Sequence, residues 1–402
     1  MKAAFRWITN HAAWYYLLFL LTVPTTLFLN HEWPNSPSIK GQNLAIVLPV
    51  GLALASFGFW AYYRAKFRLN RVSVIAFGAW VVLWFVSVTS AFTHGSSWNY
   101  TVIVTGLFPL LFMTKPISSS SILKYSDFFA YSLVALVLIT EILAFTKGRP
   151  AHNAIPVHWG WISDVTGVTE RWYGPFGYPS FAGIAGAYLL VYGLARNTRS
   201  TLFVAVAGAF MTVFSGQNTA VIGGLIGVLA VWVLSDGHLR FGLRTRARAL
   251  IASAGVIGVA SFALIQNPTL SLRTPLYPIF LDFWESSPLS GVGNTQIVEA
   301  AANGAIPQGL TSAHNAYIDI AARYGLLGLV PFLVLLVCAF LLAWNSWRRG
   351  SSLSLILIIT FAVISLVEFQ GDWTYLTVAM SFLFIAISLA ASTSSSQSSN
   401  VA

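Results

Sequence analysis

The amino-acid sequence predicts an all-α polytopic membrane protein with about 12 transmembrane helices. Hydrophobic residues make up 56% of the 402 residues and charged residues only 8%, whereas about a quarter of the residues in a soluble domain are charged. The mean hydropathy is +0.72. Long apolar segments recur along the chain, and Lys and Arg gather in alternate connections between them. These three observations exclude a water-soluble protein.

Each predicted helix corresponds to one apolar segment. A bilayer core about 30 Å thick requires about 20 apolar residues per helix, and shorter helices are tolerated. The seventh and eighth segments are separated only by Gly216, Gln217 and Asn218, which would have to form a tight turn. The segments are approximately 14–29, 44–62, 72–92, 100–114, 127–145, 180–195, 201–215, 219–235, 249–265, 326–344, 353–369 and 374–391.

The two ends of the chain are predicted to differ in structure. Lys2 and Arg6 precede the first apolar segment, which lacks a small-residue cleavage site and therefore reads as an uncleaved span. Residues 1–391 are predicted to form a single transmembrane domain, and the polar, Ser-rich residues 392–402 a disordered cytoplasmic tail. Cys338 is the only cysteine, which excludes an internal disulfide.

The distribution of basic residues predicts the topology. Most of the 22 Lys and Arg residues lie in connections that would face the cytoplasm together with both termini. The basic run after Arg240 is explained in the same way and does not indicate a nucleic-acid partner. The basic residues predicted to lie outside are Lys40, Lys147, Arg149, Arg171, Arg273 and Arg323. Five of these fall in two long external loops, about 147–179 and 266–323, whose Trp, Tyr, Pro and Gly content favours ordered structure with short helices.

The segment after the second loop, 310–331, is the first candidate for chemistry. Ser312 is a candidate helix N-cap, which would put His314 in the first turn. There the positive end of the helix dipole disfavours a second positive charge and keeps the imidazole neutral, as a general base must be. The alternative is a structural histidine at a helix start. Asp319 and Arg323 have the spacing of an ion pair within the helix, which is the simpler explanation of Arg323.

Two external arginines are candidates for anion binding. Arg171 is followed by the turn sequence GPFGYP, and Arg273 precedes a short amphipathic helix that ends in a glycine turn. Arginine suits bidentate recognition of phosphate. The arginines would hold an anionic leaving group while His314 takes a proton from a hydroxyl nucleophile. Alternatively, Arg171 snorkels to the interface, and Trp172 and its neighbouring tyrosines form an aromatic belt.

Other chemistry has less support. The seven histidines are scattered, and the chain has no HExxH, paired CxxC, GxSxG or Walker-type loop, so a metal site is unsupported. Glu141 and Glu368 lie near the outer ends of predicted spans, where an acid is a functional hypothesis. The external carboxylates Asp164, Glu170, Asp282 and Glu285 could supply a second acid.

Three patches between 171 and 331 resemble the bacterial O-antigen ligase and O-antigen polymerase superfamily. The patches are RWYGPFGYPSFAG from Arg171, Arg273 with the later SPLSGVG, and AHNAYIDIAARYGLLGLVPF around His314. They are similar to an arginine before a glycine and aromatic turn, to an external helix that ends in a Gly-x-Gly turn, and to a His-led helix that enters a span. The third patch is the most specific.

The resemblance implies a GT-C-like helical fold, an external active site and no required metal. The donor would be a polyprenyl-diphosphate-linked glycan, and the acceptor a glycan or lipid-linked glycan in the bacterial cytoplasmic membrane. His314 would deprotonate the acceptor hydroxyl, and Arg171 and Arg273 would bind the diphosphate. Tyr173, Asn315 and Gln217 complete the implied substrate-binding set, with Gln217 standing where family members often carry an arginine.

The branch of the family stays open between ligase and polymerase, and two other classes of protein compete with it. Ser180 stands where an Asn is common in the family, which leaves the substrate open. A multi-span secondary transporter or lipid-linked glycan flippase would suit the number of spans, but the chain shows no internal repeat and its external charges are concentrated in loops. A membrane scaffold is the third possibility.

Overall fold

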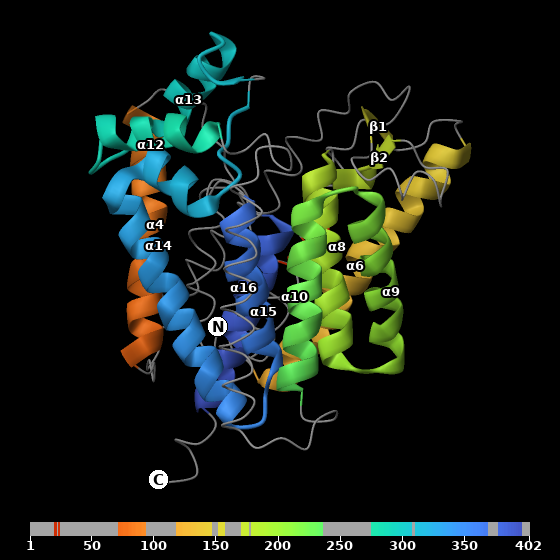
Figure 1. Cartoon of the computed structure of the whole chain (residues 1–402). Helices are drawn as coiled ribbons and strands as arrows, with labels where there is room; N and C mark the ends of the chain where they lie inside the picture. Colours follow the sequence, from red (N-terminus) through yellow and green to blue (C-terminus); the bar gives the residue numbers. More distant parts are fainter. Residues whose placement is uncertain are drawn as a thin grey trace, which may run out of the picture.

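The computed structural model describes a bundle of roughly parallel and antiparallel helices with short helices and strands at one end (Figure 1). The residues described are 20–21, 23–24, 71–93, 118–146, 152–156, 170–176, 178–235, 275–307, 310–368 and 377–395. The predicted spans at 44–62, 100–114 and 249–265 lie outside these residues, and so does Arg273.

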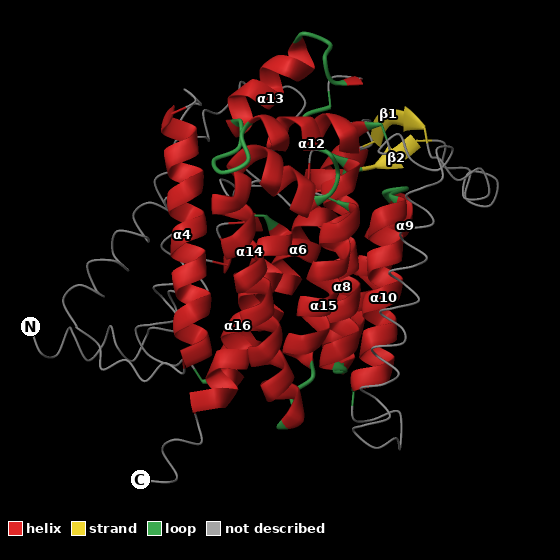
Figure 2. Cartoon of the chain, turned by 60° about the vertical axis from the view of Figure 1, so that its left-hand side comes forward, coloured by secondary structure: helices red, strands yellow, loops and turns green. Residues whose placement is uncertain are grey.

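The long helices of the described part run along the bundle, as Figures 1 and 2 show. They are α4 (Arg71–Thr93), α6 (Ser119–Thr146), α8 (Pro179–Arg196), α9 (Arg199–Phe214), α10 (Asn218–Leu234), α14 (Ala316–Arg348), α15 (Leu353–Val367) and α16 (Val378–Ser395). Each contains most of one predicted span. Of these helices, α4, α6 and α14 are long and apolar enough to cross a membrane, and α9, α10, α15 and α16 are shorter apolar helices.

Two helix ends differ from the prediction. Helix α6 begins about two turns earlier than its apolar segment, because the Ser118 hydroxyl accepts a hydrogen bond from the Ser121 amide at 3.2 Å and caps a polar first turn. Helix α16 continues to Ser395, so the first residues of the predicted tail are helical. The tight turn predicted between α9 and α10 is confirmed at residues 215–217.

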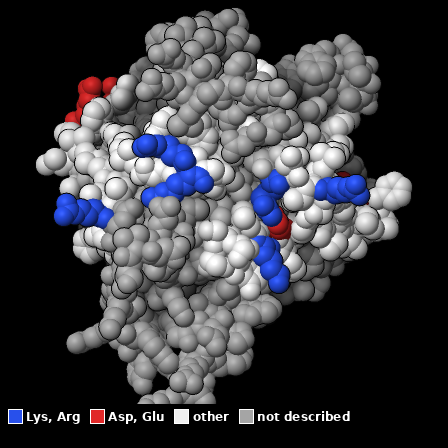
Figure 3. Space-filling model, turned by 90° about the horizontal axis from the view of Figure 1, so that it is seen from below, with Lys and Arg blue, Asp and Glu red and all other residues white. Residues whose placement is uncertain are grey.

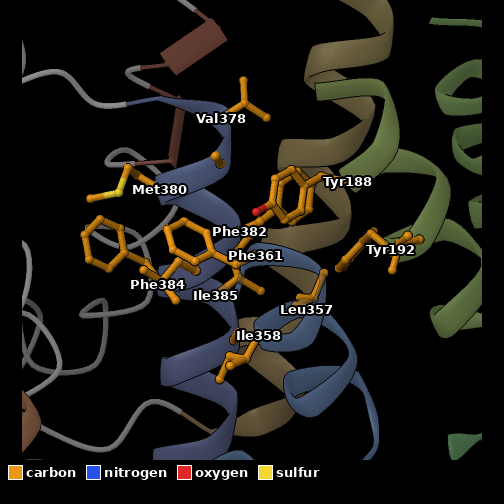
Figure 4. Close-up of a cluster of buried hydrophobic side chains, with 14 of the residues drawn as sticks. Tyr188, Tyr192, Leu357, Ile358, Phe361, Val378, Met380, Phe382, Phe384 and Ile385 are labelled. Carbon is orange, nitrogen blue, oxygen red and sulfur yellow. The ribbon is translucent and has the colours of Figure 1, made fainter. Parts of the chain in front are cut away.

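The centre of the bundle is the contact of α8 with α15 and α16 (Figure 4). The ring of Tyr188 stacks on Phe382 with centroids 5.2 Å apart, and Tyr192 approaches the same ring at 5.6 Å. Helices α8 and α9 approach more closely, since a Cβ atom on Gly208 would lie 2.3 Å from the backbone nitrogen of Leu190. Such small-residue contacts let helix backbones pack tightly in a membrane.

The short elements at this end of the mostly helical bundle include a two-stranded sheet, which the sequence did not predict. Strand β1 (His152–Pro156) pairs antiparallel with β2 (Glu170–Trp172), and the 3-10 helix η1 (Gly174–Phe176) follows. The second predicted loop does contain short helices, α12 (Leu276–Ser286) and α13 (Gly293–Ala302). All these elements lie at one end of the bundle (Figure 1).

Basic residues gather at the opposite end of the bundle, as the view in Figure 3 shows. Lys124 lies in the second turn of α6, Arg196 and Arg199 flank the α8–α9 turn, and Arg348 and Arg349 end α14. These helix ends lie away from β1, β2, α12 and α13. The charge separation predicted from the sequence is therefore present in the described part of the chain.

Helix α14 is broken at Gly325, where φ is 60° and ψ is −156°. The amides of Leu326 and Leu327, which lose their helical partners at the break, donate to the carbonyls of Pro288 and Leu289 at 2.8 and 3.0 Å. A Cβ atom on Gly325 would lie 2.3 Å from the Leu289 carbonyl group. The segment after α12 is thus hydrogen-bonded to the point where the apolar part of α14 begins.

Candidate active site

The start of α14 differs from the predicted one. Asn315, rather than Ser312, is the N-cap, and its side-chain oxygen accepts from the amides of Tyr317 and Ile318 at 3.0 and 3.2 Å. His314 therefore precedes the helix and does not lie in its first turn. Its φ of 54° falls in the left-handed region. This conformation costs a non-glycine residue about 1–3 kcal/mol, and it persists only where contacts with neighbouring groups offset that cost.

The carboxylate of Asp319 fixes the loop that carries His314. It accepts from the Ser312 hydroxyl at 2.9 Å and from the amides of Ala313 and Asn315 at 3.2 and 3.4 Å. The Ser312 oxygen in turn accepts from the His314 amide at 2.9 Å. Asp319 is fully buried, and hydrogen bonds to a buried carboxylate are strong and directional. The strained backbone of His314 is held in this way from both sides.

The predicted ion pair between Asp319 and Arg323 is confirmed, with 3.6 Å between its charged atoms. Arg323 also donates to the side chain of Asn294 in α13 and to the carbonyl of Thr311. It is buried, with an exposed fraction of 3%. Arg323 thus joins α13, the loop before α14 and α14 itself, and its contacts are structural.

The side chain of His314 meets a carboxylate from another helix. Its Nδ1 atom lies 2.5 Å from Oε1 of Glu368, the residue that ends α15. The side chain of Glu368 is only 4% exposed, whereas that of His314 is 18% exposed. The other carboxylate oxygen accepts from the Thr219 hydroxyl in the first turn of α10 at 3.4 Å. The ends of α10, α14 and α15 therefore meet around one imidazole.

This arrangement can support proton transfer. A carboxylate that accepts from Nδ1–H fixes the imidazole tautomer, leaves Nε2 as the basic atom and stabilises the imidazolium once a proton arrives. Nε2 has no hydrogen-bond partner among the described residues. The predicted role of the helix dipole is thus replaced by a specific partner, and His314 can act as a general base towards a group that approaches from the exposed side.

Both the oxygen and the nitrogen of the Asn315 side-chain amide form hydrogen bonds with backbone groups. Its oxygen caps α14, and its amide nitrogen donates to the carbonyl of Leu366 near the end of α15 at 3.0 Å. Gln217 is the N-cap residue of α10, is 7% exposed and stands two residues before Thr219. Gln217 is therefore a near neighbour in sequence of Thr219, whose hydroxyl donates to Glu368. The predicted substrate contacts of both residues stay predictions.

Arg171 lies in β2, opposite Asn153 of β1, and is buried with 6% exposure. The indole of Trp172 donates to Glu141 of α6 at 2.7 Å and is 2% exposed, so Trp172 is a buried packing residue and not part of an aromatic belt. Tyr173 is half-buried at the start of the turn into η1. Arg171 and Tyr173 lie at the same end of the bundle as His314, and their approach to it stays a prediction.

Residues 181–333 match the O-antigen ligase family. This segment is similar to the O-antigen ligases. This match confirms the resemblance to the O-antigen ligase and polymerase superfamily and supports a ligase- or polymerase-type role in polysaccharide assembly. No curated protein matches the chain at a significant level. The matched segment includes Gln217, His314 and Asn315, while Arg171 precedes it and Glu368 follows it.

Sequence reasoning missed three contributions to the site. Glu368 was noted only as an acid near the outer end of a span, and its pairing with His314 joins residues 54 positions apart. Thr219 and the Asp319 contacts with the loop were not predicted. The sequence did contain one indication of this pairing. Glu368 follows an apolar segment that begins just after the basic residues Arg348 and Arg349, so it should lie at the opposite end of the bundle, where His314 lies.

Proposed function

We propose that this protein is a membrane glycosyltransferase of the O-antigen ligase and polymerase type. It transfers a glycan from a polyprenyl-diphosphate donor to a sugar hydroxyl on the external face of the bacterial cytoplasmic membrane. The observation that carries the proposal is the pair formed by His314, inside the segment similar to O-antigen ligases, and Glu368, with 2.5 Å between Nδ1 and Oε1.

The proposed reaction is a single displacement. The acceptor hydroxyl gives its proton to Nε2 of His314 as its oxygen bonds to the anomeric carbon of the donor. The bond between that carbon and the diphosphate oxygen breaks, and polyprenyl diphosphate leaves with the electron pair. Glu368 keeps the imidazole in the basic tautomer and balances its charge after proton transfer.

The leaving group gains negative charge, and two features support its binding at this end of the bundle. Arg171 and Arg273 are the proposed diphosphate ligands, since guanidinium groups pair with phosphate oxygens in a bidentate manner. Helices α8, α10 and α14 also begin here, and helix N-termini favour anions. Tyr173 and Gln217 are proposed to contact the donor sugar or its diphosphate.

The proposed orientation puts the active site outside and both termini in the cytoplasm. It is supported by the basic residues at the end of the bundle opposite His314, because cytoplasmic connections carry an excess of Lys and Arg. The site is proposed to need no metal, as the resemblance to the O-antigen ligase and polymerase superfamily implies. Undiminished turnover in EDTA would support this part of the proposal, and loss of turnover that Mg²⁺ restores would contradict it.

The central experiment measures consumption of a polyprenyl-diphosphate glycan by the purified protein in proteoliposomes. His314→Ala should abolish turnover while the protein remains folded. Arg199→Gln, an exposed residue at the opposite end, is the matched control and should turn over normally. Wild-type turnover in His314→Ala would remove the proposed catalytic base, and gradient-dependent transport without donor turnover would indicate a transporter instead.

A deletion strain separates the two branches of the family. Loss of long chains with single repeat units still attached would indicate a polymerase, whereas accumulation of long unattached chains would indicate a ligase. Mass spectrometry of the product then identifies the acceptor.

A further inference from the structure

A cavity of about 730 Å³ lies at the end of the bundle opposite the candidate active site. One face of α6 and the C-terminus of α8 line it. Its lining includes Leu123, Lys124, Asp127, Phe128 and Tyr131 of α6 together with Arg196 of α8. The α6 residues recur at spacings of three and four, so they form one stripe of the helix. The volume is in the range of sites that bind small molecules and lipid headgroups.

Polarity changes along the cavity in one direction. Helix α6 begins at the basic end of the bundle, so its later residues lie deeper. Lys124 and the end of α8 lie at the end of the lining nearer the basic end of the bundle, here called the mouth, while Phe128 and Tyr131 lie one and two turns further along α6, about 6 and 10 Å from Lys124. A lining that is charged at the mouth and apolar and aromatic further along α6 matches a phospholipid, whose phosphate lies at the interface and whose acyl chains extend along the membrane helices.

The charges at the mouth favour an anion. Asp127 accepts from Nε and Nη2 of Arg196 at 2.9 and 2.8 Å, and from the hydroxyl of Tyr192 at 2.6 Å. These bonds fix the guanidinium group at the mouth. Among the described residues, none accepts a hydrogen bond from its Nη1 group, which can therefore donate to a ligand. Lys124 is exposed and forms no ion pair with any described residue. The lining residues therefore carry one positive charge in excess.

We propose that this cavity binds an anionic phospholipid of the leaflet at the basic end of the bundle. The phosphate contacts Lys124 and Nη1 of Arg196, and an acyl chain extends past Phe128 and Tyr131. Basic pockets between membrane helices are suited to anionic headgroups because they combine charge with access from the bilayer. This site is separate from the proposed transfer reaction, and its test does not depend on turnover.

Native mass spectrometry of the purified, delipidated protein tests the proposal. Phosphatidylglycerol and phosphatidylcholine with identical acyl chains are added in equal amounts, and retained lipid is counted. Phosphatidylglycerol should be retained preferentially. Lys124→Gln should weaken this retention about fivefold, the effect of removing one cation near a lipid phosphate. Arg199→Gln removes another exposed cation at the same end but outside the described lining, and should retain the lipid as the wild type does.

A second variant keeps the test independent of Lys124. Ser120 is exposed in the first turn of α6 and lines the same mouth, so Ser120→Glu adds repulsion where a carboxylate also favours the helix. It should reduce phosphatidylglycerol retention without lowering thermal stability. Equal retention of the two lipids, or equal losses in Lys124→Gln and Arg199→Gln, would overturn the proposal. Inorganic phosphate that displaces the lipid at millimolar concentration would identify a soluble phosphate ligand instead, and would also overturn it.

Discussion

Replacing Glu368 by Gln tests how His314 is activated. The change preserves the size of the side chain but removes the charge next to Nδ1, where the contact is 2.5 Å and the carboxylate is almost fully buried. The Gln amide group can donate to Nδ1, which would put the imidazole proton on Nε2. The imidazole would then present a donor to the acceptor hydroxyl and could no longer take its proton.

The expected loss is large. An acid-to-amide change that reverses the tautomer of a catalytic histidine lowers kcat by about 10⁴-fold, or about 5.5 kcal/mol in activation free energy. The partner is buried here, so water cannot easily replace it, and we expect a fall of 10³ to 10⁴-fold. The KM for the donor should change little, since Glu368 is not proposed to touch substrate.

The assay is steady-state transfer by the reconstituted protein at varied donor concentration, with the thermal unfolding midpoint as a check on folding. Thr219→Val is the matched control, because it removes only the 3.4 Å hydrogen bond to the other carboxylate oxygen and should reduce kcat less than tenfold. A folded Glu368→Gln protein whose kcat stays within threefold of the wild type would refute the reasoning, as would a change confined to KM.

Three further predictions follow from the loop, the helix break and the sheet. Asp319→Asn should destabilise the protein by about 3–5 kcal/mol, because it leaves Arg323 buried without its ionic partner. It should also lower kcat per folded molecule at least tenfold, because the loop that carries His314 loses its carboxylate. An unchanged kcat would show that Asp319 contributes to stability alone. Gly325→Ala should lower the unfolding midpoint sharply, since the new Cβ meets the Leu289 backbone, whereas Gly304→Ala, at a φ of 77° with open space around it, should have a much smaller effect; equal effects would contradict the close contact. Arg171→Lys should raise the donor KM at least tenfold through loss of bidentate phosphate contacts, and an unchanged KM in steady-state assays would remove Arg171 from the diphosphate site.

The sequence predicted well those features that depend on composition and local pattern. Long apolar runs require helices in a bilayer because every backbone group must be satisfied internally, and α4, α8, α10 and α15 accordingly follow their segments closely. The pair of Asp319 and Arg323 was predictable because residues four apart are neighbours on a helix.

Features that depend on contacts between distant segments were not predictable in this way. Ser312 and Asn315 are both good N-caps, and the choice between them follows from Asp319, which binds the Ser312 hydroxyl. Trp172 and the exposed Tyr178 have similar sequence surroundings, yet only Trp172 is buried, because Glu141 on α6 accepts its indole proton. The pairing of His314 with Glu368 depends on how α14 and α15 pack, which periodicity does not encode.

The break at Gly325 also determines which length of α14 has to match the bilayer. An unbroken helix of 33 residues would be about 50 Å long and would exceed a hydrocarbon core of about 30 Å. Residues 326–348 alone measure about 34 Å, which fits with a modest tilt. A change in lipid chain length would then alter the tilt of this lower part, while the loop around His314 is bonded to Asp319 above the break and to the end of α15. Hydrophobic mismatch is thereby kept separate from the geometry of proton transfer.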